Sequence, residues 1–156
     1  MTDRGRTTVS RIINAPAEAI YRAILDQDSL AAWLAPDSMT GVVHAFDGRE
    51  GGTFRMSLMY PESEASARGK TSDRTDTFQA RFARLVPNEL IVWAVEFESS
   101  DPAFAGEMIM STSLVPAGGG TKVTVLCENI PPGIRPQDNE AGCRSTLEKL
   151  ASFLHG

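Results

Sequence analysis

The sequence predicts an α+β fold: a curved antiparallel sheet of six or seven strands wraps around one long C-terminal helix, and two short helices follow the first strand. The stretch from Pro136 to Leu154 has the apolar periodicity of a helix with one buried face. Much of the preceding chain alternates apolar and polar residues, as strands do. The breaks between these runs have the length of hairpins, which join antiparallel strands. The apolar face of such a sheet needs a cover, and the C-terminal helix is the largest one that the sequence offers.

The C-terminal helix is expected to begin at Pro136, which fixes its own φ and has no N–H to leave unpaired in the first turn. Asp138 follows in that turn, where the positive end of the helix dipole favours acidic side chains. One face of the helix is apolar: Cys143, Leu147, Leu150, Ala151 and Leu154. A helix of this length is about 30 Å long, which is enough to lie across a whole sheet.

The first strand is expected at Thr7–Asn14, which is rich in β-branched residues. A helix then follows Ala15-Pro16, and one of its faces is apolar: Ala17, Ile20, Tyr21, Ile24 and Leu25. Asp26–Asp28 interrupts this helix, and a second short helix is expected at Ser29–Leu34, ended by Pro36. We expect the two helices to form a bent bracket at one end of the sheet.

Further strands are expected through the middle of the chain: Thr40–Phe46, Thr53–Tyr60, Phe78–Val86, Leu90–Phe97, Glu107–Val115 and Thr121–Asn129. Turn residues separate several of them, at Asp47-Gly48, Pro87-Asn88 and Ala117–Gly120. The segment Pro61–Asp76 is polar and lacks large apolar residues, so we expect a mobile loop there. The sequence has no internal repeat and no linker, which predicts a single domain over residues 1–156.

Composition argues against several classes of protein. The chain has 156 residues, of which 42% are hydrophobic and 22% charged, as in a soluble globular domain. The net charge of −5 and the lack of a basic stripe argue against a nucleic-acid partner. The N-terminal residues have no apolar signal-peptide core, and no apolar run reaches the roughly 20 residues of a membrane span. We therefore expect a cytoplasmic protein without a membrane partner, either a monomer or a homodimer.

Few residues offer catalytic or metal-binding chemistry. Cys127 and Cys143 lie within apolar patterns, which predicts buried thiols rather than a disulfide or a metal pair. The motifs typical of zinc, dinucleotide and phosphate sites are absent, so we expect no metal, no cofactor and no catalytic residue. We expect His44 to be structural or exposed. Glu107 and Arg144 are expected to form surface ion pairs, with an inward pair across a pocket mouth as the alternative.

Short segments spread over roughly Thr7 to Leu154 resemble a known family: Asn14–Glu18 with Tyr21, Leu30–Pro36, Gly51–Met56, Leu85–Glu89, Gly106–Met108, Gly119–Val125 and Asp138–Arg144. In their order and spacing they resemble the SRPBCC superfamily, and more narrowly its branch of Hsp-90 ATPase activator homologues. The resemblance implies the START-like helix-grip fold. The superfamily includes lipid and hormone carriers and polyketide cyclases, and the branch includes co-chaperone domains. One residue departs from the family pattern, because Cys143 stands where many relatives have Trp, and this removes bulk from the helix face.

A cavity is expected between the sheet and the C-terminal helix. Strands lie about 4.8 Å apart and a helix is about 10 Å wide, so one helix cannot fill the concave face of such a sheet. The predicted ligand-binding residues are the side chains expected to face this cavity: Trp33, Phe54, Met56, Leu58, Tyr60, Phe78, Trp93, Val95, Met108, Met110, Thr112, Cys143 and Leu147. The predicted function is the binding of an apolar small molecule rather than catalysis. A co-chaperone module that stimulates a chaperone ATPase is the alternative, and a cyclase or hydrolase, which needs an inward ionisable group, is a third class.

Overall fold

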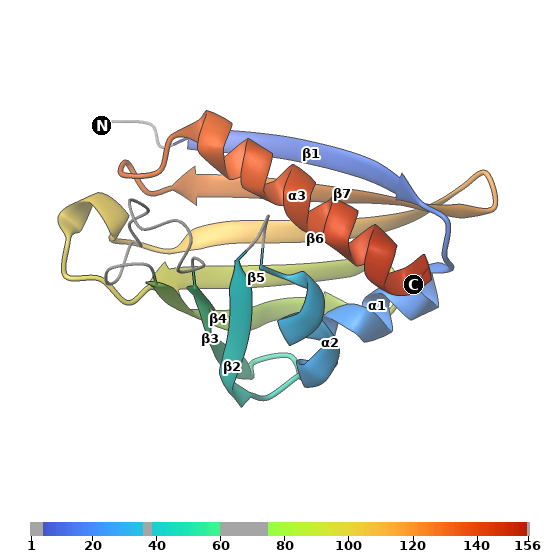
Figure 1. Cartoon of the computed structure of the whole chain (residues 1–156), viewed down its shortest axis with the longest axis horizontal. Helices are drawn as coiled ribbons and strands as arrows, with labels where there is room; N and C mark the ends of the chain where they lie inside the picture. The colour runs from blue at the N-terminus through green and yellow to red at the C-terminus, as the bar shows by residue number, and fades with distance from the viewer. Residues whose placement is uncertain (1–4, 36–38, 60–74, 156) are drawn as a thin grey trace.

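A seven-stranded antiparallel sheet bends around the helix α3 in the computed structural model, which describes residues 5–35, 39–59 and 75–155 (Figure 1). The strands lie side by side in the order β1-β7-β6-β5-β4-β3-β2. Their bounds are β1 Gly5–Ile13, β2 Thr40–Phe46, β3 Thr53–Met59, β4 Thr75–Val86, β5 Leu90–Phe97, β6 Met108–Ala117 and β7 Gly120–Ile130. The first strand along the chain, β1, pairs with the last strand, β7. Both strands lie beneath α3 (Figure 1). The predicted α+β fold is confirmed.

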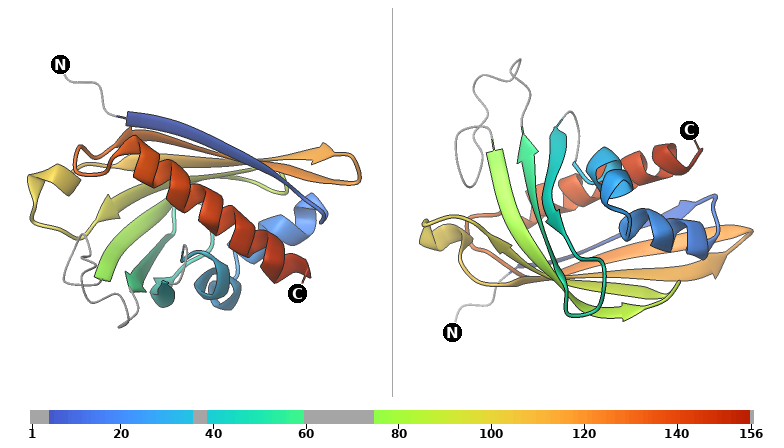
Figure 2. Two further views of the ribbon diagram at one scale, coloured as in Figure 1. Left: turned by 45° about the horizontal axis from the view of Figure 1, so that its top comes forward. Right: turned by 90° about the horizontal axis from the view of Figure 1, so that it is seen from below.

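Bulges give the sheet part of its curvature. The register of β2 with β3 shifts between Val43 and Ala45, and the register of β4 with β5 shifts between Phe82 and Arg84. An irregularity of this kind bends a strand and increases its twist. The β6–β7 hairpin turns at Gly118, whose φ of 51° is in the region that glycine adopts most readily. Figure 2 shows the bent sheet from two further sides, with α3 along its concave face.

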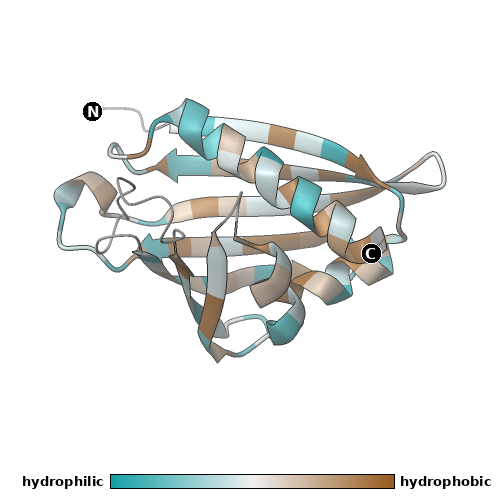
Figure 3. Cartoon of the chain, in the orientation of Figure 1, coloured by the Kyte–Doolittle hydropathy of each residue, from teal (hydrophilic) through white to brown (hydrophobic). Residues whose placement is uncertain are grey.

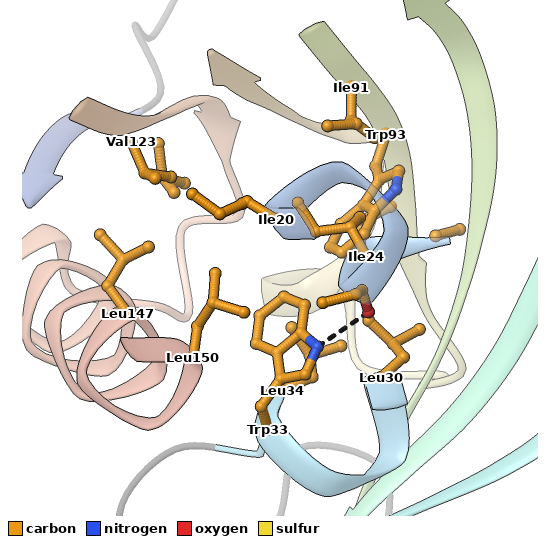
Figure 4. Close-up of a cluster of buried hydrophobic side chains, with 14 of the residues drawn as sticks. Ile20, Ile24, Leu30, Trp33, Leu34, Ile91, Trp93, Val123, Leu147 and Leu150 are labelled. Carbon is orange, nitrogen blue, oxygen red and sulfur yellow. Dashed lines mark hydrogen bonds between the residues drawn. The ribbon is translucent and has the colours of Figure 1, made fainter. Parts of the chain in front are cut away.

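The helices are α1 (Ala17–Ile24), α2 (Gln27–Trp33) and α3 (Pro136–His155), with a short 3-10 helix η1 (Pro102–Phe104). The helices α1 and α2 form the expected bracket at one end of the sheet (Figure 1). Trp33 joins them, because its Nε1 donates a hydrogen bond of 3.0 Å to the Ala23 carbonyl (Figure 4). Both groups are buried, so the bond fixes the angle between the two helices.

The helix α3 is held against the end of α2 by two polar contacts that the apolar pattern did not predict. Thr146 Oγ1 donates to the Leu34 carbonyl at 3.0 Å, and Lys149 Nζ donates to the Ala35 carbonyl at 2.6 Å. Carbonyls at the end of a helix have no partner within the helix. The side of α3 turned away from the sheet carries several hydrophilic residues (Figure 3). The expected amphipathic helix is therefore present, and side-chain donors add to its apolar contacts.

The core extends from the bracket to the middle of the sheet. In the bracket and on α3, Leu30 and Leu150 are at most 1% exposed, and they lie among the buried side chains of Figure 4. On the sheet, Phe54 is fully buried and centres an aromatic cluster with ring-centroid distances of 5.1 Å to Trp93 and 5.5 Å to Phe82. Tilted and edge-on ring pairs at these distances add to the stability gained from burial.

Several predicted boundaries differ from the observed ones by one or more residues, and two of these differences have a clear physical reason. The expected loop Pro61–Asp76 includes the first residues of β4, because Thr75 and Asp76 pair with β3 and Asp76 is 2% exposed. The rest of that predicted loop, up to residue 74, lies outside the described residues. The helix α2 begins at Gln27 rather than Ser29, because the Asp26 side chain accepts a hydrogen bond of 2.9 Å from the Ser29 amide and caps the helix there.

Candidate functional site

A cavity of about 830 Å³ lies between the concave face of the sheet and α3. The sheet contributes Leu58, Asp76, Phe78, Trp93, Val95, Phe97, Met108, Met110, Thr112 and Val125. The helix α3 contributes Asp138, Asn139, Ala141, Gly142, Cys143, Thr146, Leu147 and Leu150. The bracket and the connecting segments complete the wall with Ile24, Trp33, Leu34, Met39, Phe104, Gly133 and Ile134. Most of the wall is therefore apolar, and its few polar groups come mainly from α3.

Strand alternation explains which sheet residues reach the cavity. Successive side chains of a strand point to opposite faces. Trp93, Val95 and Phe97 therefore share the concave face of β5, and Met108 and Met110 share that of β6. Methionine side chains are flexible and adapt to ligands of different shape. The sheet supplies a wall that is apolar and partly adaptable.

The helix leaves room for the cavity because it carries small residues where it passes over the sheet. Gly142 and Cys143 both lie in the cavity wall. A Cβ atom built on Gly142 would have no atom within 4 Å outside its own helix neighbourhood, so the space beside it is open. Leu147 and Leu150, further along α3, are buried and close the cavity towards the bracket. The step from small to large residues along α3 sets one end of the cavity.

The residues predicted from the sequence to bind a ligand are mostly in the cavity wall. Trp33, Leu58, Phe78, Trp93, Val95, Met108, Met110, Thr112, Cys143 and Leu147 all line it. Phe54 and Met56 do not, because both are fully buried and pack deeper in the core, behind the wall. Tyr60 lies outside the described residues. The alternation of β3 correctly predicted that Phe54 and Met56 face inward. Alternation does not predict whether an inward side chain borders the cavity or lies deeper in the core.

Sequence reasoning missed several polar groups of the wall. Asp76 is 2% exposed and shares the concave face of β4 with Phe78. Counting back from Phe78 by two would have found it, but the polar composition of its neighbours assigned it to a loop. Asn139 lies in the first turns of α3, and its Oδ1 accepts a hydrogen bond of 2.5 Å from Thr7 Oγ1 on β1. No periodic signal in the sequence joins Asn139 to Thr7.

Trp93 carries the unsatisfied donor of the site. Among the described residues, its Nε1 is buried without a hydrogen-bond acceptor. A buried donor without a partner costs about 1–3 kcal/mol, which the packing of the indole ring against Phe54 offsets in part.

The two cysteines lie face to face at the edge of the cavity. Cys127 on β7 is fully buried, Cys143 on α3 is half-buried, and their sulfur atoms are 3.9 Å apart. The hydrogen bond from Cys143 lowers the pKa of Cys127, and contacts with Asn139 and Thr7 act in the same direction. The hydrogen bond to Cys127 and burial raise the pKa of Cys143. The pair therefore loses its first proton more readily than a single buried thiol and its second proton less readily.

The ionisable residues considered for catalysis lie away from the cavity wall. His44 is exposed, and its Nε2 lies 2.7 Å from Ser57 Oγ. Glu107 pairs with Arg81 at 3.8 Å. Arg144 pairs with Glu140 at 2.7 Å, so the inward Glu107–Arg144 pair is not formed. Within the described part of the chain, no three or more His, Cys, Asp or Glu residues come together in a way that would hold a metal ion.

Comparison with known proteins agrees with the overall fold. The chain matches the family model described as Activator of Hsp90 ATPase homolog 1-like protein over residues 14–155. It is 30% identical to a protein from Chromobacterium violaceum whose crystal structure superposes with a TM-score of 0.83, with 97% of each chain covered. A solution NMR structure of the AHSA1-like protein from Aeromonas hydrophila is 17% identical, with a TM-score of 0.73, and covers 97% of this chain and 92% of its own. No curated protein matches the chain. In the residues that the structure describes, no helix has the length and apolar content to cross a membrane.

Proposed function

We propose that this chain, which belongs to the family of Activator of Hsp90 ATPase homolog 1-like proteins, binds an apolar small molecule in the cavity between its sheet and α3. The cavity volume of about 830 Å³ carries this proposal. Protein interiors are close-packed and contain few voids larger than a water molecule, whereas ligand pockets typically enclose about 300–1,000 Å³. The volume of this cavity lies within the range of ligand pockets, which supports a binding role.

The chemistry of the wall defines the ligand class. Aromatic and methionine side chains such as Trp93, Phe97 and Met110 cover most of the sheet side, which favours a ligand with a largely apolar body. Thr112 and Asn139 offer a hydroxyl and an amide to one or two polar groups of the ligand. The predicted ligand-binding residues that line the cavity are the proposed contact residues. His44 lies outside the wall, so any acid–base chemistry in the cavity would fall to the buried carboxyl of Asp76.

Cavity-filling substitutions at Gly142 test this function. Gly142→Phe places an aromatic ring in the open space beside α3, whereas Gly142→Ala adds one methyl group and is the matched control. Native mass spectrometry of freshly purified protein would detect a retained ligand. A thermal-shift screen of aromatic, fatty and steroidal compounds would find ligands that were lost.

At a ligand concentration about a hundred times Kd, we expect the wild type and Gly142→Ala to gain roughly 5–10 °C in Tm. Gly142→Phe should gain nothing with the same compound. Equal gains for Gly142→Phe and the wild type would place the binding site elsewhere. A wild-type protein that retains no ligand and responds to no compound class would contradict the proposal.

The family match motivates a second candidate, a protein-interaction module that stimulates a chaperone ATPase. The two functions use different surfaces, because a carrier uses the cavity and a co-chaperone uses outer strand positions and loops. The ATPase rate of an Hsp90-type chaperone should be measured with the wild type and with Gly142→Phe. Stimulation that survives the filling of the cavity would favour the second candidate, and its absence with both proteins would argue against it.

A further inference from the structure

Cys127 and Cys143 form a close thiol pair that the proposed ligand-binding function does not use. Their sulfur atoms are 3.9 Å apart, although one residue lies on β7 and the other on α3. The chain has two cysteines in total, so this contact brings all of its thiols together. Cys143 lines the cavity, whereas Cys127 is 0% exposed behind it.

We propose that Cys127 and Cys143 are a modification site, at which a small hydroperoxide oxidises the pair to an intramolecular disulfide that joins α3 to β7. The proposal stands independently of the ligand, because it rests on the contact between the two sulfur atoms and on the access of Cys143 to the cavity. A disulfide has an S–S distance of about 2.05 Å. Closing the present 3.9 Å therefore requires the sulfur atoms to approach by about 1.9 Å.

The surroundings of the pair prepare it for oxidation. Thiolates rather than thiols react with peroxides. The hydrogen bond between the two sulfur atoms lets them share one negative charge, and Thr7 and Asn139 lie next to Cys127 and help to stabilise that charge. Cys127 holds this charge because its pKa is the lower of the two, and it can accept the proton of Cys143, the sulfur that faces the cavity. The oxidant can reach that sulfur without unfolding of the protein.

The reaction proceeds in two balanced steps. The Cys127 thiolate takes the proton of Cys143 while Cys143 Sγ attacks the outer oxygen of the hydroperoxide, the O–O bond breaks, and the leaving alkoxide takes up from solvent the proton that the pair had released, to become an alcohol. Cys143 is then a sulfenic acid. The Cys127 sulfur attacks Cys143 Sγ, the S–O bond breaks, and hydroxide leaves and takes up the Cys127 proton as water. Overall, two thiols and one hydroperoxide give one disulfide, one alcohol and one water.

Hydrogen peroxide is a suitable probe. We expect the intact mass of the native protein to fall by two hydrogens, and peptide mapping to identify a link between the peptides that contain Cys127 and Cys143. Dithiothreitol should reverse the change. A ring of this size should raise Tm by roughly 5–10 °C relative to the reduced protein. In Cys127→Ser the reaction should stop at the sulfenic acid of Cys143, which dimedone would trap.

A relocated thiol provides the matched control. The double variant Cys143→Ser with Ser145→Cys keeps two cysteines at nearly the same sequence separation, but it moves the helical thiol by about 200° around α3. We expect oxygen-added or intermolecular products from this variant instead of the intramolecular disulfide. The proposal is overturned if the native wild type gains oxygen without losing two hydrogens, or if the relocated pair forms the intramolecular disulfide as readily as the wild type.

Discussion

Gly142 offers a sharp test of the geometry of α3, because replacing it with alanine should stabilise the protein. Gly142 lies inside the helix Pro136–His155, where a glycine has more conformational freedom to lose on folding than an alanine. A Cβ atom at this position would have no atom within 4 Å outside the local helix. The substitution therefore introduces no clash and adds almost no new packing, so the helix propensity decides its effect.

The expected gain is the difference in helix propensity between glycine and alanine, about 0.5–1 kcal/mol in the free energy of unfolding. For a chain of this size, such a gain raises Tm by roughly 1–4 °C. Urea unfolding and calorimetry of the ligand-free protein would measure it. The slope of the urea transition should stay unchanged, because the surface exposed on unfolding is nearly the same.

The same substitution at Gly52 should act in the opposite direction. A Cβ atom there would lie 2.3 Å from the Asp47 carbonyl oxygen and 3.0 Å from that of Arg49. These are backbone atoms, so the strand and the turn beside it would have to move, and the free energy of unfolding should fall.

A lower stability of Gly142→Ala than of the wild type would refute the description of Gly142 as a helical residue beside open space.

Three further changes test the contacts that hold the helices. Thr146→Val should lower the free energy of unfolding by about 0.5–1.5 kcal/mol, because it removes the hydroxyl that donates to the Leu34 carbonyl. Thr146→Ser keeps a hydroxyl, so urea titrations should show a free energy of unfolding close to that of the wild type. Leu150→Ala should cost about 2–5 kcal/mol, since Leu150 is 1% exposed, and a loss below about 1 kcal/mol would contradict its packing. Asp26→Ala should lower Tm at neutral pH by removing the cap on the Ser29 amide. Hydrogen bonds from the Ser29 hydroxyl and the Ser29 amide lower the pKa of Asp26. The stabilisation by Asp26 is therefore fully present above the usual carboxyl pKa of about 4 and is lost as the pH falls further. A difference in Tm between wild type and variant that persists at pH 2 would argue against this cap.

The buried face of α3 was predictable from the sequence because a helix repeats every 3.6 residues. Leu147, Leu150 and Ala151 are all at most 5% exposed. The sheet face of the cavity was predictable for the same kind of reason, since alternation places Trp93 and Val95 on one side of β5. The order of the elements and their short connections then left a curved antiparallel sheet around one helix as the predicted architecture.

Local patterns were misleading where composition and tertiary contacts disagree. Asp76 belongs to a strand, although its neighbours in sequence are polar, because pairing with Leu58 on β3 extends β4 beyond its apolar part. Gln27 belongs to α2, because the Asp26 side chain satisfies an amide of the first turn. In both cases, hydrogen bonds that the chain makes after folding decided the boundary.

Which residues face inward follows from the amino-acid sequence, because the periods of helices and strands assign each side chain to a face. How deep each of them lies, and which of them meet, depends on the packing of the whole fold. Phe54 and Leu58 share a face of β3, yet Phe54 fills the core and Leu58 borders the cavity, because the rings of Phe78, Phe82 and Trp93 surround Phe54 whereas Leu58 lies near the end of the strand. Cys127 and Cys143 were each predicted to be buried, but their contact at 3.9 Å arises from the position of α3 over β7. A local period contains no information about such distances between elements, since the packing of all the elements together sets them.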